Sequence, residues 1–575
     1  MTDARGTGRY GLVVGAVGLA LVGLLTRLTT LHAGLAEKSG EEIDASRVTR
    51  QFVNVGRGRI LDGSPVRNLL AVNVAAWDVC ADPKTIVASN CVGEVAAALA
   101  SVLGLRSADV AAALNQPESR YVRIRPLVPE EQATAVQNLG LPGVFCRQRL
   151  RRAYPQGVSL CHVLGFANDE GVGAAGVEQI MERYLRGVPG LLETKVDGNR
   201  RELYLQRIRY VPPEDGADVV LTVDQNLQYL VEKALDVAVE QHHARAAWAI
   251  MQRVRTGEIL AMASRPAYDP NDFRHTSEAQ RFNRAIGCLY EPGSTFKVAV
   301  IAAALEERLV EPSTVFDCEN GQWLYQNRIL RDHHPHRVLT VADILKKSSN
   351  IGAAKIAVLM GDARLERHLR AFHIGARLGI DLPGEEAGIL HPAARWSAIS
   401  SSRIAIGQGV AVTALQMLGV LSAIANDGMV MRPYVVRQVV DARGRVVLQR
   451  EPQPLGRAIS AETAAVMRQL LARVTEPGGT GTQAAVPGFV VAGKTGTAQK
   501  PVNGVYSETD YVASFVGFVP AEDPEIAMIV VVDEPQPFHT GGAVAAPVFG
   551  QIAGQAVRYL GILPPAYAMG RTDEP

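Results

Sequence analysis

A serine and a lysine stand three residues apart, at Ser294 and Lys297, where a hydroxyl could become a nucleophile. A Pro-Gly pair at 292–293 breaks the chain before them, and an apolar, alanine-rich run at 298–305 follows, which predicts a helix beginning at or near Ser294. Residues three apart share one helix face, so a desolvated Lys297 amine could take the serine proton. The helix N-terminus would add positive charge where an oxyanion forms. The pair predicts acyl transfer; an N-capping serine beside a solvated lysine is the alternative.

Ser348-x-Asn350 occurs once in the chain, at the end of a helix that a capping box at Thr340 and Asp343 would begin. Beside an activated serine, the Ser348 hydroxyl could relay a proton and the Asn350 amide could orient a substrate amide. Considered alone, the same triplet is an ordinary turn at a helix end.

A β-rich segment carries Lys494, Thr495, Gly496 and Thr497. Glycine inside a strand often marks the close approach of a ligand. One ammonium and two hydroxyls on such a strand suit a substrate carboxylate lying antiparallel to it. An edge strand protected by a lysine is the alternative interpretation.

Histidines and cysteines are the remaining candidates for metal or redox chemistry. His333, His334 and His336 lie in a polar stretch and lack a second group of ligands at zinc spacing, so a solvated loop and no metal site are predicted. The six cysteines form no C-x-x-C pair, and Cys80 and Cys91 are closest in sequence. Disulfides and buried thiols both remain open for them.

Length and composition indicate the class of protein. A chain of 575 residues is too long for one ordinary core, so two or more domains are expected. A net charge of +1 with 20% charged residues gives no basis for nucleic-acid binding. Hydrophobic content of 47% suits a globular α+β chain that carries a membrane segment.

The membrane segment is an unbroken apolar run, Gly11–Leu25, which follows Arg5 and Arg9 and precedes Arg27. The basic side predicts a cytoplasmic N-terminus, with residues 1–27 as a cytoplasmic tip and an uncleaved single-pass anchor in the inner (cytoplasmic) membrane. The catalytic residues would then be exported to the periplasmic side. A cleaved signal peptide is the alternative, although no small-x-small pair lies close behind the run.

The rest of the chain divides near 212–216. Residues 28–49 predict a helical stalk. Within residues 50–215, strands are expected around 57–62, 70–73 and 81–84, with helical stretches between 92 and 140. Beyond the boundary the pattern predicts a strand at 218–224, a helix at 225–240, and a hairpin of strands around 248–251 and 257–262.

Ser294-x-x-Lys297, Ser348-x-Asn350 and Lys494-Thr-Gly496, in this order, form the signature of active-serine penicillin-recognising enzymes. Over roughly residues 50–560 the chain resembles the class B penicillin-binding proteins, and above all their division-type, FtsI-like D,D-transpeptidases. The sequence departs from that family after Asp62, where Gly-Ser-Pro replaces the usual Arg-Asn, and before Thr256, where Gln-Arg stands in place of an Asp. The further segments that carry the resemblance are Arg57–Asp62, Arg152–Gly157, Gly173–Glu178, Ile406–Gly409 and Gly541–Pro547.

The resemblance implies an α+β fold in two parts. Residues 50–215 would form a non-catalytic, dimerisation-like pedestal, and residues 216–560 the transpeptidase domain. That domain would hold an antiparallel sheet, containing the Lys494 strand and strands at 511–519 and 526–533, flanked by helices. Residues 561–575 would be a disordered tail.

The resemblance also implies a mechanism without cofactor or metal. Ser294, activated by Lys297, would attack the penultimate D-Ala of a peptidoglycan stem peptide, and β-lactams would acylate the same serine. Ser348 would relay a proton and Asn350 orient the donor. Lys494 with Thr495 would bind the terminal carboxylate, and the N–H groups of Ser294 and Thr497 would hold the oxyanion.

A neighbouring stem amine would then resolve the acyl-enzyme, in septal wall synthesis beside an FtsW-like membrane glycosyltransferase and other divisome proteins. Three alternatives stay open: an elongation-type transpeptidase, a hydrolytic β-lactamase or carboxypeptidase, and a catalytically silent divisome scaffold or β-lactam sensor.

Overall fold

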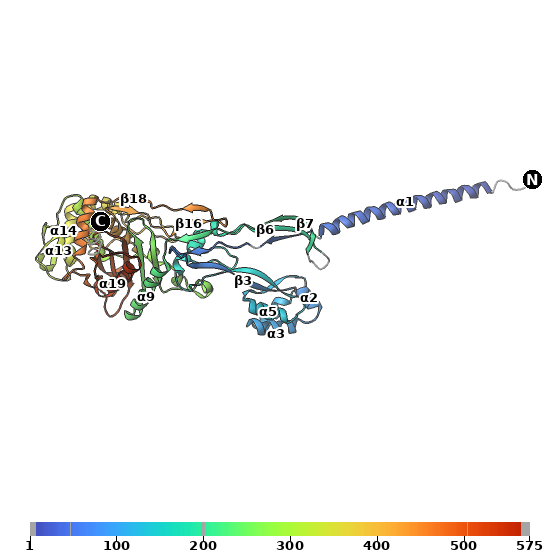
Figure 1. Ribbon diagram of the computed structural model, residues 1–575, viewed down its shortest axis with the longest axis horizontal. Helices are drawn as coiled ribbons and strands as arrows, with labels where there is room; N and C mark the ends of the chain where they lie inside the picture. Colours follow the sequence, from blue (N-terminus) through green and yellow to red (C-terminus); the bar gives the residue numbers. More distant parts are fainter. Residues whose placement is uncertain (1–6, 47, 54, 197–201, 503, 565–575) are drawn as a thin grey trace, which may run out of the picture. The chain divides into compact units, whose positions relative to one another are not determined.

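The computed structural model describes residues 7–46, 48–53, 55–196, 202–502 and 504–564 (Figure 1). The first residues of the predicted cytoplasmic tip, and the predicted tail from residue 565 onward, lie outside the described residues. The chain forms two compact units. The first comprises residues 1–56 and 187–215, and the second comprises residues 57–186 and 216–575.

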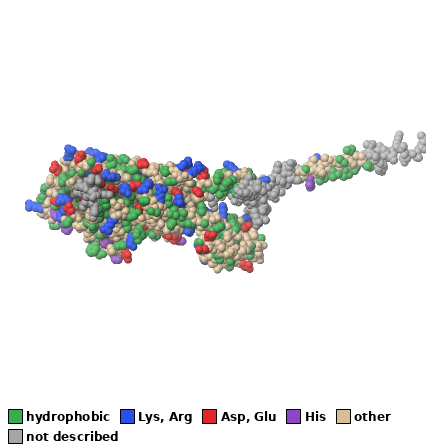
Figure 2. Space-filling model, in the orientation of Figure 1, with side chains coloured by type: hydrophobic (Ala, Val, Ile, Leu, Met, Phe, Trp, Pro, Cys, Tyr) green, Lys and Arg blue, Asp and Glu red, His purple; other side chains and the backbone are tan. Residues whose placement is uncertain are grey.

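The first unit joins one long helix to a small sheet. Helix α1 (Thr7–Ser46) runs without a break through both the predicted anchor and the predicted stalk, which confirms that the stalk is helical. The apolar stretch that could cross a membrane is Val14–Ala33, whose side chains are exposed along the helix (Figure 2). The sheet is antiparallel, in the order β1 (Val48–Val53), β6 (Gly190–Val196), β7 (Glu202–Val211).

The span is longer than the Gly11–Leu25 run because threonines extend it. The hydroxyls of Thr26, Thr29 and Thr30 donate to backbone carbonyls one turn earlier, with Thr26 Oγ1 lying 2.7 Å from the Val22 oxygen. A hydroxyl satisfied within its own helix is tolerated in lipid. The 20 residues of Val14–Ala33 cover about 30 Å, the thickness of a hydrocarbon core.

The second unit begins with a seven-stranded mixed sheet whose strands come from distant parts of the chain. Its β2 runs parallel to β8, so one sheet contains strands from both sides of the predicted boundary near 212–216. The order is β17 (Val446–Gln449), β16 (Val436–Val440), β8 (Asp218–Leu221), β2 (Ile60–Leu61), β3 (Leu69–Ala81) and β4 (Val122–Val128), with β5 (Val144–Ala153) paired to β3.

Four helices pack with β3, β4 and β5 around a small core of their own: α2 (Pro83–Ala88), α3 (Val92–Leu103), α4 (Ser107–Leu114) and α5 (Glu130–Asn138). The strand expected around Ala81–Lys84 is wrong, because Asp82 accepts a hydrogen bond from the Thr85 N–H and Pro83 begins a helix. The prediction of helical stretches within 92–140 also missed β4, in which four of seven residues are Val, Ile or Leu, with exposed arginines at 123 and 125 between them.

The segments of the pedestal motifs meet in a buried ion network. Glu178, on α7 (Gly176–Ile180), is fully buried, and its carboxylate lies 2.7 Å from Arg57 Nε and 2.6 Å from Arg152 Nε. Arg57 also binds Glu182, on α8 (Glu182–Leu185), at 2.6 Å. The network therefore ties three segments far apart in sequence to one another.

The Gly-Ser-Pro sequence that departs from the family after Asp62 supplies a hydrogen bond to the Asp62 carboxylate. Asp62 is fully buried and accepts hydrogen bonds from the Ser64 hydroxyl at 2.8 Å and from the N–H of Asn68 at 2.7 Å. The Gln225 N–H, at the start of α9 (Gln225–Gln241), lies 3.2 Å from the same carboxylate. Ser64 thus helps to satisfy a carboxylate that joins the first motif to the next helix.

A five-stranded, fully antiparallel sheet is the centre of the second unit, which confirms the predicted α+β fold, the hairpin and the strands. Helices α9 and α19 (Gly541–Tyr559) lie side by side and share one core with it (Figure 1). The strand order is β10 (Ile259–Arg265), β9 (Ala246–Arg253), β21 (Ile526–Asp533), β20 (Val505–Val519) and β19 (Ala492–Val502).

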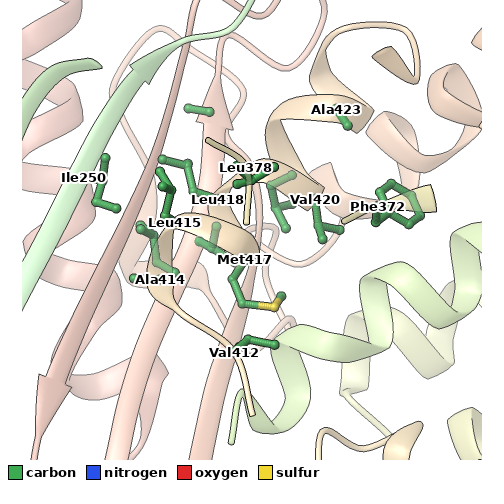
Figure 3. Close-up of a cluster of buried hydrophobic side chains, with 14 of the residues drawn as sticks. Ile250, Phe372, Leu378, Val412, Ala414, Leu415, Met417, Leu418, Val420 and Ala423 are labelled. Carbon is green, nitrogen blue, oxygen red and sulfur yellow. The ribbon is translucent and has the colours of Figure 1, made fainter. Parts of the chain in front are cut away.

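Helix α17 (Ala414–Ala425) packs against strands β9, β20 and β21 and is apolar on nearly every side. Figure 3 shows Leu415 and Leu418 of this helix near Ile250 of β9, with Val420 on the side of Phe372. A helix without a polar face belongs inside a protein, so α17 separates the sheet from an outer group of helices. That group contains α12 (Lys297–Glu306), α13 (Val341–Lys347), α14 (Asn350–Met360), α15 (Asp362–Ala371), α16 (Ser400–Ile404) and α18 (Ala461–Ala472).

Short elements complete the second unit. They are α6 (Cys161–Leu164), α10 (Glu278–Arg281), α11 (Arg284–Gly287), β11 (Val315–Asp317) with β14 (Val338–Thr340), β12 (Gln322–Tyr325) with β13 (Arg328–Arg331), and β15 (Met429–Met431) with β18 (Pro454–Arg457). All six cysteines are free thiols, of which Cys80, Cys161 and Cys318 are buried and the other three are partly exposed.

Replacing Glu178 with Gln should lower the free energy of unfolding by about 3–5 kcal/mol, because two buried guanidinium groups lose their carboxylate. Denaturant unfolding of the purified chain measures the loss. The matched control is Asp109→Asn at the exposed Arg106 ion pair, which should leave the free energy of unfolding nearly unchanged because solvent screens that pair. Equal effects for the two variants would contradict a structural role for the network.

Candidate active site

Ser294 lies in a turn of 3-10 helix, Gly293–Phe296, and the α-helix itself begins at Lys297. The predicted helix start is therefore confirmed to within one turn. Gly293 has a φ of +56°, a conformation that favours glycine. A Cβ on Gly407 would lie 2.2 Å from the Gly293 oxygen, so the Ile406–Gly409 loop can support the Ser294 turn only with glycine at this position.

The Lys297 side chain is fully buried, and its ammonium nitrogen contacts every predicted catalytic residue. Nζ lies 2.9 Å from Ser294 Oγ, 3.2 Å from Ser348 Oγ and 2.7 Å from Asn350 Oδ1. It also donates to the Ser348 carbonyl oxygen at 2.7 Å. The fold thus brings the first two motifs, more than 50 positions apart, around one nitrogen.

Burial controls the charge of Lys297. Desolvation lowers its pKa to about 7, and the Asp332 carboxylate opposes part of this shift. About half of a lysine with this pKa is unprotonated at pH 7 and can accept a proton, whereas an exposed lysine is almost fully protonated there. Because Ser294 Oγ is within hydrogen-bond distance, Lys297 is placed to activate it.

Ser348 stands between the two buried lysines. Its backbone has a φ of +61° as the C-cap of α13, which is a strained conformation for a residue other than glycine. Its hydroxyl lies 3.0 Å from Lys494 Nζ as well as 3.2 Å from Lys297 Nζ. The serine hydroxyl can therefore pass a proton between the two amines.

Lys494 is fully buried on β19, where the third motif was expected to form a strand. Desolvation lowers its pKa well below the usual value, and the charge of Lys297 adds to the effect. The Thr495 hydroxyl lies 2.8 Å from that of Thr480. A substrate carboxylate arriving here would meet an ammonium and two hydroxyls, and its charge would favour the protonated form of Lys494.

Gly496 and Thr497 contribute packing and shape. A Cβ on Gly496 would lie 2.3 Å from Ser514 Oγ and 2.9 Å from Thr295, so β19 approaches the Ser294 turn because position 496 has no side chain. The Thr497 hydroxyl accepts a hydrogen bond at 3.0 Å from the Gly541 N–H, at the start of α19. The Gly541–Pro547 segment is thereby attached to the site.

Asp332 was not predicted as a site residue, although the second motif depends on it. Its carboxylate accepts hydrogen bonds from the N–H groups of Asn350 and Ile351 and from the Ser349 hydroxyl, so it caps the start of α14. The Asn350 amide nitrogen donates to the Arg331 carbonyl at 2.8 Å. Only the folded β13–α14 arrangement reveals these contacts, since Asp332 lies 18 positions before Asn350.

Two cavities meet at Ser294. The first, of about 660 Å³, is bordered by Ser348, Thr480 and Thr495, and the second, of about 470 Å³, by Asn350 and Glu291. His333 and Thr497 line both cavities together with Ser294. The loop of three histidines, expected to be solvated, therefore forms part of the site wall. In the described ranges no group of three His, Cys, Asp or Glu side chains is arranged to hold a metal.

The sequence matches two domain families. Residues 247–554 match the penicillin binding protein transpeptidase domain, and residues 52–221 match the penicillin-binding protein dimerisation domain. The first of these matches contains all eight predicted site residues.

Relatives and solved structures give the same result. The chain is 32% identical to the peptidoglycan D,D-transpeptidase FtsI of Escherichia coli K12, covering 98% of this chain and 94% of that protein. It is 34% identical to the stage V sporulation protein D of Bacillus subtilis, over 88% of this chain and 79% of that one. Penicillin binding protein 3 of Mycobacterium tuberculosis, solved with aztreonam, matches with a TM-score of 0.69 and 27% identity, over 89% and 99% of the two chains.

With a dimerisation domain ahead of a transpeptidase domain, and a lysine buried against the serine of the first motif, the chain belongs to the class B penicillin-binding proteins.

Proposed function

We propose that this chain is a peptidoglycan D,D-transpeptidase, which cross-links stem peptides through an acyl-enzyme on Ser294. The observation that carries the proposal is the fully buried Lys297 amine, 2.9 Å from Ser294 Oγ, with a pKa lowered to about 7. The roles of individual residues, the placement in the cell and the septal role belong to the same proposal.

Acylation would begin in the first cavity. Lys494, Thr495 and Thr480 would hold the terminal carboxylate of the donor peptide, which places the penultimate D-Ala carbonyl over Ser294 Oγ. Lys297 would accept the Ser294 proton as the nucleophile attacks. The N–H groups of Ser294 and Thr497 would stabilise the oxyanion, at about 3–4 kcal/mol for each donor.

Collapse of the tetrahedral intermediate requires a proton on the leaving D-Ala amine. Ser348 supports such a transfer, because its hydroxyl lies within hydrogen-bond distance of both Lys297 Nζ and Lys494 Nζ. Asn350 would keep the Lys297 amine directed at Ser294 through its Oδ1, in addition to orienting the donor. A β-lactam would acylate Ser294 by the same steps.

The proposed domains are a cytoplasmic tip and anchor at 1–27, a stalk at 28–49 whose first turns continue the membrane span to Ala33, a pedestal at 50–215 and a transpeptidase domain at 216–560. The two family matches, at 52–221 and 247–554, support the last two. Arg5 and Arg9 ahead of the apolar stretch support a cytoplasmic N-terminus and a catalytic domain on the outer side of the cytoplasmic membrane.

A septal role is supported by the identity with a protein named FtsI over nearly the whole chain. Partners would be an FtsW-like membrane glycosyltransferase and other divisome proteins. On α1, Gly15, Gly18 and Gly23 have open space where a side chain would be, and small residues let two membrane helices approach closely.

Replacing Ser294 with Ala should abolish covalent labelling by fluorescent penicillin and the transfer of D-alanyl donors, because the nucleophile is removed. Circular dichroism and thermal unfolding are expected to match the wild type. Lys494→Ala should slow labelling, and Lys494→Arg should slow it less, since arginine keeps the charge but not the shape. Wild-type labelling by the Ser294 variant would disprove the proposed nucleophile.

The rate of acylation should rise with pH through about 7, because the neutral Lys297 amine is the active form and its fraction grows above its pKa. Stopped-flow measurements of penicillin acylation between pH 5 and 9 test this. The Asp332 carboxylate raises the pKa of Lys297, so Asp332→Asn should move the midpoint to lower pH. An acylation rate independent of pH across this range would contradict the base role.

The mature protein should keep residues 1–27 and fractionate with membranes, because Val14–Ala33 is long enough to span the hydrocarbon core. Mass spectrometry of the N-terminus, with protease accessibility of intact cells and spheroplasts, measures retention and orientation. A new N-terminus close to residue 30 in a soluble form would show a cleaved signal peptide instead.

A further inference from the structure

His333 occupies the one wall that the two cavities at Ser294 have in common. The four residues that line both are Ser294, His333, Thr497 and Thr540. Of these, His333 alone has a side chain that can take up a proton near neutral pH. Its exposed imidazole makes no hydrogen bond to the described part of the protein and borders both cavities.

The backbone at His333 is held in place by its neighbour. Asp332 is anchored by the N–H groups of Asn350 and Ile351 and by the Ser349 hydroxyl. These contacts hold the residue immediately before His333. The backbone that carries the His333 imidazole is therefore fixed beside the Ser294 site.

The surroundings of His333 keep its imidazole neutral. Desolvation by the surrounding protein lowers its pKa, the charges of Lys297, His334 and His539 lower it further, and Asp332 alone opposes them. A neutral imidazole can accept a proton, which an imidazolium cannot. The other charged or titratable groups lining the two cavities are Glu291, Arg331, His336, Lys347, Arg403 and Tyr511.

The rival bases in the second cavity are already engaged. Glu291 accepts hydrogen bonds from the Gly409 N–H at 2.8 Å and from the Tyr506 hydroxyl at 2.9 Å. His539 is stacked on Tyr511, with ring centroids 4.1 Å apart. The Asp332 carboxylate is occupied by the start of α14.

A transpeptidase needs a second base event after acylation. The terminal carboxylate leaves with D-Ala on acylation, so an acceptor amine reaches the acyl-enzyme on Ser294 through the cavities that His333 lines. This amine is an ammonium at neutral pH and cannot attack until it loses a proton. Lys297, which served acylation, lies on the buried side of Ser294 and is needed to return a proton to Oγ.

We propose that His333 is the general base for the acceptor, taking a proton from the acceptor ammonium where the two cavities meet beside Ser294. This role rests on the proposed transpeptidase function. The acceptor R–NH₃⁺ gives one proton to His333, and the free amine attacks the Ser294 ester. The C–N bond forms and the C–Oγ bond breaks; the second amine proton passes through Lys297 to Oγ. The product is an amide, Ser294 is regenerated, and His333 releases its proton to water.

The test compares acylation with transfer in full-length His333→Gln protein. A D-alanyl thioester serves as donor, and D-alanine or hydroxylamine as acceptor. D-alanine is mostly protonated at pH 7, whereas hydroxylamine is mostly unprotonated. Transfer to D-alanine should fall about 100-fold, while penicillin acylation and transfer to hydroxylamine stay within about twofold of wild type. Free imidazole should restore transfer to D-alanine in His333→Ala.

Control variants separate this role from a structural one. His391→Gln removes an exposed histidine elsewhere and should leave every rate unchanged. Unchanged transfer to D-alanine in His333→Gln would overturn the proposal, as would a parallel loss of acylation or a larger loss in His334→Gln or His539→Gln. The two proposals fail in different ways. If wild-type protein does not label with penicillin, the proposed function is wrong. If wild type labels and transfers but the His333 variant transfers to D-alanine equally well, only this inference is wrong.

Discussion

Burial of the Lys297 amine against the Ser294 hydroxyl is the interaction on which the rest of the site depends. An exposed lysine would keep its proton and leave the serine inert, so the helices around α12 must exclude water from Nζ. The cost of burying this group is met by acceptors rather than by a single counter-charge: Ser294, Ser348 and Asn350 all lie within hydrogen-bond distance. The same acceptors fix the direction of the amine.

A second buried amine, Lys494, lies across Ser348 from the first, and the charge of Lys297 adds to the desolvation that lowers the pKa of Lys494. This repulsion makes the empty site receptive to an anion. A substrate carboxylate beside Lys494 would favour a proton there while leaving Lys297 free to act as a base. Binding of a donor carboxylate and activation of Ser294 would therefore be linked through electrostatics.

Close approach of the backbone provides the remaining constraint. The Ser294 turn is enclosed by Gly407 on one side and Gly496 on the other, and a Cβ at either position would collide with atoms of the neighbouring segment. Asp332 performs a similar task for the second motif by capping α14. These contacts explain why short motifs separated by long stretches of chain converge on a site of fixed shape.

Local patterns in the sequence were enough to predict the α+β fold class and the contact between the nucleophile and its base. Ser294 and Lys297 are neighbours on one turn, so local spacing alone predicts their contact, and the alternation of apolar residues predicts the strands at 511–519 and 526–533. The strand prediction was wrong at Ala81–Lys84, where Asp82 caps a helix that begins at Pro83. The sequence patterns also missed strand β4, which lies among helical stretches.

Features that depend on contacts between residues far apart in the sequence became visible only in the folded structure. The pKa of Lys297 follows from burial by helices outside its own motif, and the α14 cap comes from Asp332, which follows strand β13. The sequence predicts that His333 lies in a solvated polar loop. Only the folded structure shows that it lines both cavities at Ser294. Spacing along a chain encodes local geometry, whereas desolvation and long-range electrostatics are properties of the assembled fold.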